Sequence, residues 1–282
     1  MHVPKTSGWA LRQGLEEAVS PKNPVPQMCL DRVLFDGFDD FESFQPHIRS
    51  MVFRDSAELP DGVDFICGHM AFSTLLTAYP QAQFFTVLRE PISRILSHWL
   101  FWRSWSEKDI KQWGTHGSHV LMARRPLHEF LSRGELACQV DNLVTRMLLW
   151  PHKLIHSQQF IDERDEKTLL MDALARLRRF SFADVVENPD FVTSVSKWLQ
   201  KPFRYGRVNE ASRVPEPFRT SLQDELSEET LQLLDRRTRL DVKLWLAAAR
   251  LHLVGQSPHL VRQHALVRNI ARFSALLGTG GD

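Results

Sequence analysis

Residues 2–11 read His-Val-Pro-Lys-Thr-Ser-Gly-Trp-Ala-Leu, and they pass from a short extended stub into a helical pattern. The unpaired backbone N–H groups at a helix start carry the positive end of the helix dipole and bind phosphate or sulfate well. Lys5 adds a mobile cation, Thr6 and Ser7 add hydroxyl donors, and Gly8 allows close backbone approach. These residues alone leave two interpretations open, an anion-binding loop and an ordinary capped helix.

The rest of the chain alternates between two kinds of pattern. Short apolar runs typical of strands lie at 63–67, 84–88, 180–186 and, more weakly, 48–53, and helical patterns lie at 9–19, 92–102, 139–149, 166–178 and 191–199. Continuous apolar strands separated by helices predict a parallel sheet covered on both faces, with ligands bound at the carboxyl ends of the strands. We find no linker, so we expect one domain over 1–282.

The chain from about residue 227 onward is predicted to be helical. One face of its final helix carries large apolar side chains, namely Leu266, Ile270, Phe273 and Leu277. Another face carries a basic row, namely His264, Arg268 and Arg272. The row is compatible with a membrane-surface or partner helix. An amphipathic cap packed on the domain is the favoured interpretation.

Composition limits the classes of function. Hydrophobic residues make up 43% and charged residues 24% of the chain, and the formal net charge is +1. This balance argues against a bulk electrostatic grip on nucleic acid but allows a small polyanion to be bound by a few basic groups. The three cysteines, Cys29, Cys67 and Cys138, lack metal-type spacing and are expected to be reduced thiols.

Targeting signals are not evident in the sequence. No basic segment followed by an apolar run opens the chain, and no stretch reaches about 18 apolar residues. We therefore expect no membrane span and, if the given N-terminus is complete, a cytoplasmic location.

A second candidate anion site follows the apolar run at 84–88. Residues 87–97 read Val-Leu-Arg-Glu-Pro-Ile-Ser-Arg-Ile-Leu-Ser, with Arg89 at the predicted strand end and Pro91 in the first turn of the next helix. Ser97 comes two turns later. An arginine fork together with a hydroxyl is a good receptor for a terminal phosphate.

The two segments, in this order, resemble the loops that bind the phosphosulfate and the 3′-phosphate in PAPS-dependent sulfotransferases. The resemblance is nearest to the carbohydrate-type, heparan-sulfate-like branch and its bacterial relatives, whose patterns are HIPKTGGTSL and LRDPVERxxSxY. This chain departs from the first pattern at Ser7, which is usually glycine, and at Trp9, which removes a hydroxyl. Weaker similarities at 141–146, 180–187, 208–212 and 240–245 extend over nearly the whole chain. They make Arg146, Asn209 and Ser212 weaker ligand candidates, each more simply explained as structural.

The resemblance implies a three-layer, P-loop-like α/β fold with a central parallel sheet flanked by helices and a helical C-terminal region. It also implies PAPS as the donor, released as PAP, with no metal required. The implied donor-binding residues are Lys5, Thr6, Ser7, Gly8, Trp9, Arg89 and Ser97. Lys5 is the implied cation beside the leaving phosphate.

His69 is the candidate base. It follows the apolar run at 63–67, which places it at the ligand-binding edge of the predicted sheet, and a histidine pKa suits proton abstraction near neutrality. The carbohydrate sulfotransferases carry a similar GH segment whose histidine acts as the base. His98 lies within a predicted helix and His128 at a helix start, so both are less suited. The segment 116–119 is the nearest approach to a metal-ligand cluster and is predicted to be a loop.

The acceptor is predicted to be a hydroxyl of a carbohydrate, lipid or small molecule, recognised by loops such as 102–125. The sequence leaves the oligomeric state open. A P-loop small-molecule kinase is one alternative, although Walker A order is absent, because Lys5 precedes Gly8, and no clear acidic Mg²⁺ motif is present. The other alternative is a PAP-binding module with impaired catalysis, suggested by Trp9 and by the short first strand.

Overall fold

The computed structural model describes residues 1–32, 41–204, 206 and 214–278, and within these it has an α/β architecture. All strand pairings are parallel. β1 (Cys29–Asp31) pairs with β2 (Val52–Phe53) and with β3 (Gly68–His69). β4 (Phe85–Leu88) pairs with β5 (Phe182–Val185). The predicted α/β class with a parallel sheet is therefore confirmed.

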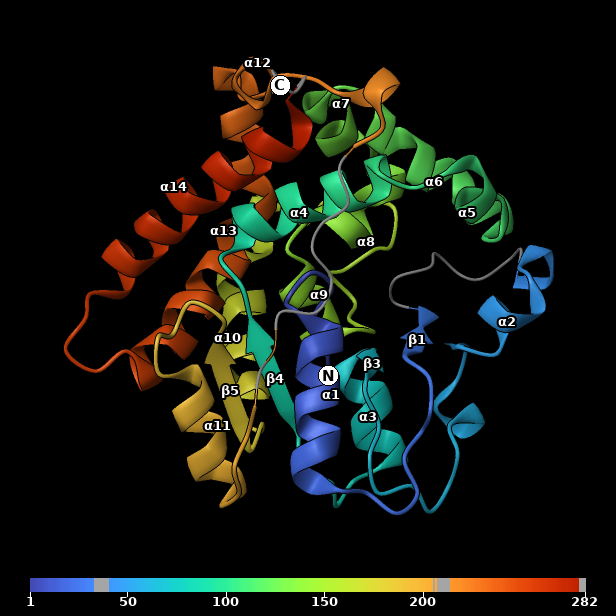
Figure 1. The fold of residues 1–282 in the computed structure, drawn as a ribbon, viewed down its shortest axis with the longest axis vertical. Helices are drawn as coiled ribbons and strands as arrows, with labels where there is room; N and C mark the ends of the chain where they lie inside the picture. Colours follow the sequence, from blue (N-terminus) through green and yellow to red (C-terminus); the bar gives the residue numbers. More distant parts are fainter. Residues whose placement is uncertain (33–40, 205, 207–213, 279–282) are drawn as a thin grey trace.

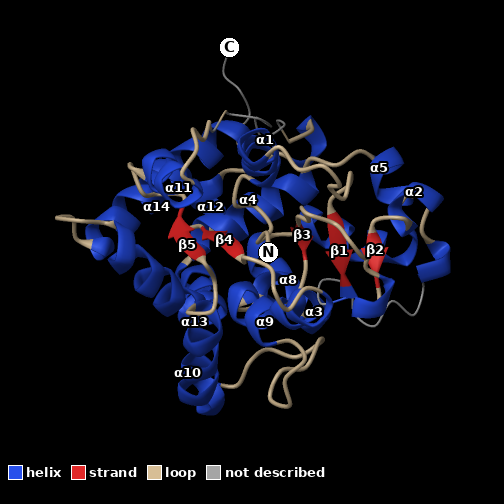
Figure 2. Cartoon of the chain, turned by 90° about the horizontal axis from the view of Figure 1, so that it is seen from below, coloured by secondary structure: helices blue, strands red, loops and turns tan. Residues whose placement is uncertain are grey.

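Residues 1–3 bridge the two groups of strands. The backbone N–H of His2 donates to the carbonyl of Gly68 at 2.8 Å, and the Met1 ammonium donates to the carbonyl of Phe85 at 2.9 Å. Figure 2 shows the strands in one row, with the N-terminus between β4 and β3. The first residues of the chain thus occupy the centre of an interrupted sheet, and the loop that follows them starts from that centre.

Helices lie on both faces of this row of strands (Figures 1 and 2). On one side lie α1 (Gly8–Val19) and α11 (Phe191–Leu199); on the other lie α3 (Phe72–Ala78), α9 (Leu143–Leu149), α10 (Glu166–Leu177) and α13 (Glu228–His252). Successive residues of β4 serve both faces, because side chains alternate along a strand. Val87 packs in the cluster with α1 and α11, whereas Leu88 packs in the cluster with α3, α9, α10 and α13.

A further group of helices packs around α4 (Pro91–Arg103), which follows β4. The long helix α14 (Pro258–Leu277) contributes Phe273 and Leu277 to the same buried cluster as Ile95 and Trp99 of α4. The expectation that the final helix packs as an amphipathic cap is confirmed. The remaining helices are short: α2 (Pro46–Arg49), α5 (Glu107–Lys111), α6 (Gly117–Leu121), α7 (Leu127–Ser132), α8 (Ala137–Val140) and α12 (Leu222–Glu225).

Single 3-10 turns connect many of these elements. They are η2 (Phe41–Ser43), η3 (Ser56–Glu58), η4 (Gly114–His116), η5 (Met122–Arg124), η6 (Gly134–Leu136), η7 (Glu163–Asp165) and η8 (Glu216–Phe218). Throughout the part of the chain that the structure describes, no helix is both long and apolar enough to cross a membrane.

Several predicted elements differ from the structure. The expected strand at 63–67 is replaced by β3 just beyond it, and 48–53 divides between α2 and β2. The segment 116–119, predicted to be a loop, lies in η4 and α6, where an edge-on contact of the His116 ring with Trp102 and a tilted one with Trp113 favour an ordered turn.

The predicted helix 139–149 is broken into α8 and α9. At the break, Asn142 adopts a left-handed conformation with φ 46°, and its side-chain oxygen accepts a hydrogen bond from the Leu240 backbone at 2.8 Å. Asparagine tolerates this conformation better than most residues, so a long-range contact interrupts the local helical pattern.

Candidate functional site

Three residues predicted to act together emerge at the carboxyl ends of neighbouring strands. His69 is the last residue of β3, Arg89 comes directly after β4, and Lys5 follows the bridging residues 1–3 between them. Because ligands bind where the carboxyl ends of parallel strands meet, this edge is the candidate site.

The turn at residues 5–7 is unusual in its backbone. Lys5 has φ 70° and Ser7 has φ 64°, both in the left-handed region that non-glycine residues seldom adopt. Among the described residues, the N–H groups of Gly8 and Trp9 at the start of α1 have no acceptor. A left-handed residue followed by helical ones forms a concave nest of N–H groups, which is a binding geometry for anions. The turn therefore leaves two N–H donors without an acceptor among the described residues.

Two residues of this loop have roles other than those expected. The Thr6 hydroxyl donates to the Val3 carbonyl at 2.7 Å, and the Thr6 side chain is buried, so the hydroxyl closes the turn from inside. A Cβ on Gly8 would lie 2.1 Å from the His2 ring. Glycine is required there because the His2 ring approaches closely, in addition to any approach by a ligand. The Trp9 side chain, by contrast, is 48% exposed.

Lys5 is held in an apolar setting. Its Nζ lies 3.8 Å from the centre of the Phe101 ring, a cation–π distance, and it makes no ion pair with any carboxylate of the described chain. Burial, reinforced by the charges of Arg89 and Arg272, lowers the pKa of Lys5 to about 7. An anion bound beside Lys5 would reverse this shift, since an opposite charge favours the charged form.

Arg89 braces the loop from the side. Its Nη1 donates to the Lys5 carbonyl at 3.1 Å, and its Nη2 donates to Oδ1 of Asn269 on α14 at 3.1 Å. The Asn269 amide in turn donates to the Ser93 hydroxyl at 3.2 Å. Arg89 is thus fixed beside the first loop by α14. Ser97 lies two turns into α4, half-buried.

The nearby carboxylate of Glu90 is engaged elsewhere. It caps α4 by accepting from the backbone of Ile92 and Ser93, at 3.3 and 2.7 Å, and it pairs with Arg262 of α14 at 3.1 Å. Glu90 therefore anchors α4 and α14 to each other, and its charge is matched by Arg262 rather than by Lys5.

His69 is poised as a neutral base. Its Nδ1 lies 2.9 Å from the His2 carbonyl oxygen, which can only accept, so Nδ1 carries the proton and Nε2 is left unprotonated. Burial, with a smaller contribution from the charge of Lys5, lowers the pKa of His69 to about 4 although the hydrogen bond to His2 opposes the shift. The ring of His2 lies 4.6 Å from that of His69.

Three further buried groups lie near this edge, of which sequence reasoning considered His98 only as a less suited base. Among the described residues, neither ring nitrogen of His2 or His98 has a hydrogen-bond partner, and Nε and Nη1 of Arg94 also lack one. Burial, together with the charges of Arg94 and Lys5, holds the pKa of His98 well below its ordinary value. Arg94, His98 and Phe101 fall at helical spacing on one side of α4, the side that meets Lys5 through Phe101.

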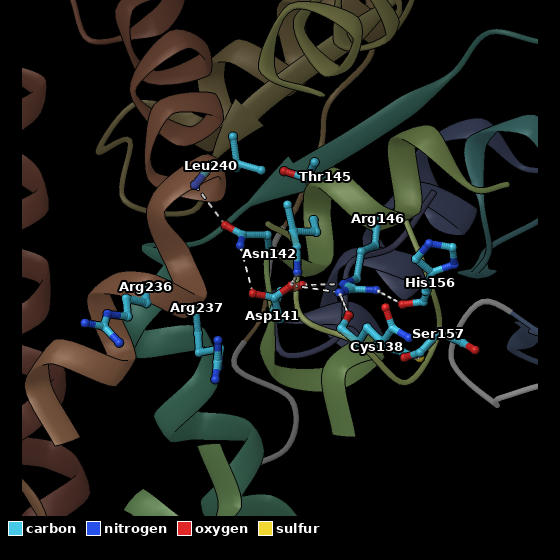
Figure 3. A network of polar contacts seen from close by, with 12 residues as sticks. Cys138, Asp141, Asn142, Thr145, Arg146, His156, Ser157, Arg236, Arg237 and Leu240 are labelled. Atoms are coloured by element: carbon cyan, nitrogen blue, oxygen red, sulfur yellow. Dashed lines mark hydrogen bonds and ion pairs between the residues drawn. The ribbon is translucent and has the colours of Figure 1, made fainter. Parts of the chain in front are cut away.

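Arg146, a weaker ligand candidate, has a structural role instead (Figure 3). Its Nη2 pairs with the Asp141 carboxylate at 2.7 Å and also donates to the Gln159 carbonyl, while Nε donates to the Asp141 carbonyl and Nη1 to the His156 carbonyl. The side chain is 2% exposed, and that of Asp141 is fully buried. This arginine holds the segment 156–161 against α9. The other two candidates, Asn209 and Ser212, lie outside the described residues.

No group of three or more histidine, cysteine or acidic side chains that could hold a metal ion occurs within residues 1–32, 41–204, 206 and 214–278. No family model, curated protein or solved structure matches the chain.

Proposed function

We propose that this protein is a sulfotransferase that moves a sulfuryl group from PAPS to a hydroxyl of a carbohydrate, lipid or small-molecule acceptor and releases PAP. The observation that carries the proposal is that three features lie at one edge of a parallel sheet: a nest of N–H groups and a lysine, neither with an acceptor or counter-ion among the described residues, and a neutral histidine. A P-loop-like nucleotide-binding architecture is part of the same proposal.

In this proposal the first loop holds the phosphosulfate. The N–H groups of Gly8 and Trp9 and the Lys5 ammonium are donors without an internal acceptor or counter-ion among the described residues, so they are available to a ligand with several anionic oxygens. Arg89, fixed by Asn269, and the hydroxyl of Ser97 would hold the 3′-phosphate. ATP has no phosphate at this position.

The chemical step needs a base, a stabilised transferring group and a cation at the leaving oxygen. Nε2 of His69 takes the proton of the acceptor hydroxyl as its oxygen forms the new bond to sulfur. The bond from sulfur to the bridging oxygen breaks, and the electron pair leaves with PAP. Lys5 stabilises the negative charge that develops on that oxygen. The low pKa of His69 keeps its ring neutral at physiological pH, so Nε2 is free of a proton, but it also makes the ring a weaker base than an ordinary histidine.

Thermal shift measurements with PAP and ADP test the donor site. We expect PAP to raise the melting temperature, and ADP, which lacks the 3′-phosphate, to have little effect, because a ligand that binds the folded state stabilises it, and does so more the tighter it binds. Equal stabilisation by ADP would favour a kinase, and stabilisation by neither would remove the donor site.

Turnover of labelled PAPS against a panel of acceptors tests the base. His69→Ala should retain the thermal shift with PAP but lose at least about a hundredfold in transfer, the scale of general base catalysis. Full turnover in His69→Ala would exclude His69 as the base. Binding of PAP without transfer to any acceptor, even in the unmodified protein, would favour a catalytically impaired module.

A further inference from the structure

The connection between α13 and α14 projects from the molecule and carries exposed apolar side chains among polar ones. Figures 1 and 2 both show this connection at the outer edge of the molecule. Leu251, Val254 and Leu260 there are 73%, 90% and 55% exposed. We call these three side chains the hairpin tip. Val267 is 63% exposed and lies two turns beyond Leu260, on the same side of α14.

The hairpin tip is held outward by an ordered turn. Nε2 of His252 bonds to the Ala183 carbonyl of β5 at 2.9 Å, and Leu253 is buried in the main core. Gly255 has φ 73°, a left-handed conformation that glycine adopts without strain and that reverses the chain toward α14. Because Leu253 and His252 fix the turn from inside, Leu251 and Val254 face solvent as a consequence of the fold.

The stretch of sequence between Asp241 and Asp282, which includes the hairpin tip, carries charged residues of one sign. Residues 242–281 contain five lysines and arginines, three histidines and no acidic residue, although the chain as a whole has 34 aspartates and glutamates in 282 residues. Arg262 points inward to Glu90, but Arg250 and Arg268 are exposed and form no ion pair within the described part of the chain. Lys243 is matched by Glu166, so the exposed apolar side chains share this segment with the exposed side chains of Arg250 and Arg268.

We propose that the hairpin tip docks on the surface of a bilayer that contains anionic lipid. Exposed leucine and valine side chains among basic ones, on an ordered helical element, are the features by which interfacial helices enter the headgroup region while their cations contact anionic lipid. The connection projects at the outer edge of the ribbon and its apolar side chains are separated along the chain, which suits a deformable lipid surface better than a shaped protein groove. The proposal does not depend on the proposed sulfuryl transfer.

Sedimentation with vesicles tests the docking. The full chain should sediment with vesicles of phosphatidylcholine and phosphatidylserine far more than with phosphatidylcholine alone, and added salt should weaken this binding by screening. The triple variant Leu251→Ser, Val254→Ser, Leu260→Ser should lose about tenfold or more in partition, since it removes the inserting side chains. Arg250→Glu with Arg268→Glu should lose the preference for anionic vesicles.

A matched variant controls for general loss of apolar surface. Met171→Ser, Val192→Ser, Leu231→Ser changes three side chains that are also exposed, at 62%, 39% and 45%, but lie elsewhere, and it should sediment like the parent. Equal sedimentation of the hairpin-tip variant, or no preference for anionic vesicles, would overturn the proposal. Self-association of the parent in solution that the hairpin-tip variant abolishes would also overturn the proposal, because the hairpin tip would then be an interface between two copies of the chain.

Discussion

Lys5 and Arg146 are two cations with opposite surroundings. Arg146 is matched on every side, by the buried carboxylate of Asp141 and by backbone carbonyls. Lys5 lies over an aromatic ring with no carboxylate partner among the described residues, and its pKa falls to about 7. Both residues belong to motifs that suggested ligand binding. The contrast indicates that the partners around a charge separate a structural cation from one available to a ligand.

The largest expected effect is on stability, at Arg146. Arg146→Met leaves the Asp141 carboxylate buried and unpaired, and such a change costs about 3–5 kcal/mol of unfolding free energy. Urea unfolding measures it. Arg164, which pairs with Asp162 on the surface, is the matched control, and Arg164→Met should leave the urea midpoint unchanged.

Should Arg146→Met fail to fold, the double variant Arg146→Met, Asp141→Asn keeps the prediction testable. Removing the second charge relieves the unpaired carboxylate, so the double variant should be more stable than the single one. A single variant as stable as the parent would contradict a structural role for Arg146.

The next effect is on turnover, at Lys5. Lys5→Met should lower transfer from PAPS by at least about a hundredfold, or about 3 kcal/mol in the barrier, by removing the cation at the leaving oxygen. Its melting temperature should stay equal or rise. A lysine whose pKa is lower in the folded than in the unfolded state opposes folding while it is charged. The gain in stability of Lys5→Met over the parent is therefore fully present below pH 7, and it declines as the pH rises toward the ordinary lysine pKa of 10.5. A much lower melting temperature of Lys5→Met would instead show that Lys5 has a structural role, like Arg146.

A smaller effect concerns pH. The pKa of Lys5 is about 7 without ligand, so above pH 7 its side chain is mostly a neutral amine. The amine must then take up a proton before it can bind an anion as an ammonium. The dissociation constant of PAP should therefore rise above pH 7, by at most about tenfold per pH unit for a single group. Calorimetric titrations across this range measure the slope, which should vanish in Lys5→Met. The same slope in both proteins would assign the titration to another group.

The smallest effect is at Asn269, which positions Arg89 through one hydrogen bond. Asn269→Ala should weaken PAP binding by about threefold to tenfold, the scale of one hydrogen bond of about 0.5–1.5 kcal/mol. Gln263→Ala, at an exposed amide on the same helix, serves as the control and should bind PAP like the parent. Unchanged affinity in Asn269→Ala would show that Arg89 needs no support from α14.

Elements with strong local patterns were predictable from the sequence. The apolar runs at 84–88 and 180–186 contain β4 and β5, and the helices α1, α4, α10 and α11 lie within a residue or two of their predicted positions. Short strands were not predictable from the sequence. β1 has three residues and β3 has two, and each forms only because it pairs with a strand distant in the sequence. The break at Asn142 likewise depends on its contact with Leu240.

Some features of the candidate site were likewise predictable from the sequence and others were not. The order of residues along the chain suggested that Lys5, His69 and Arg89 share one edge, because each follows a strand or the first extended stub. The spacing of Arg94, His98 and Phe101 was readable as one side of a helix, but the sequence did not say that this side meets Lys5. The internal bond of Thr6 to Val3 and the contact of Gly8 with His2 are close-range packing that no motif encodes.

Calorimetric titration of PAP into the parent protein, Lys5→Met and Arg146→Met tests the central contrast most directly. We expect the parent and the folded fraction of Arg146→Met to bind PAP with similar affinity, and Lys5→Met to bind it much more weakly. Equal binding by Lys5→Met and the parent, or no binding of PAP by the parent, would contradict the view that the unmatched lysine marks an anion site.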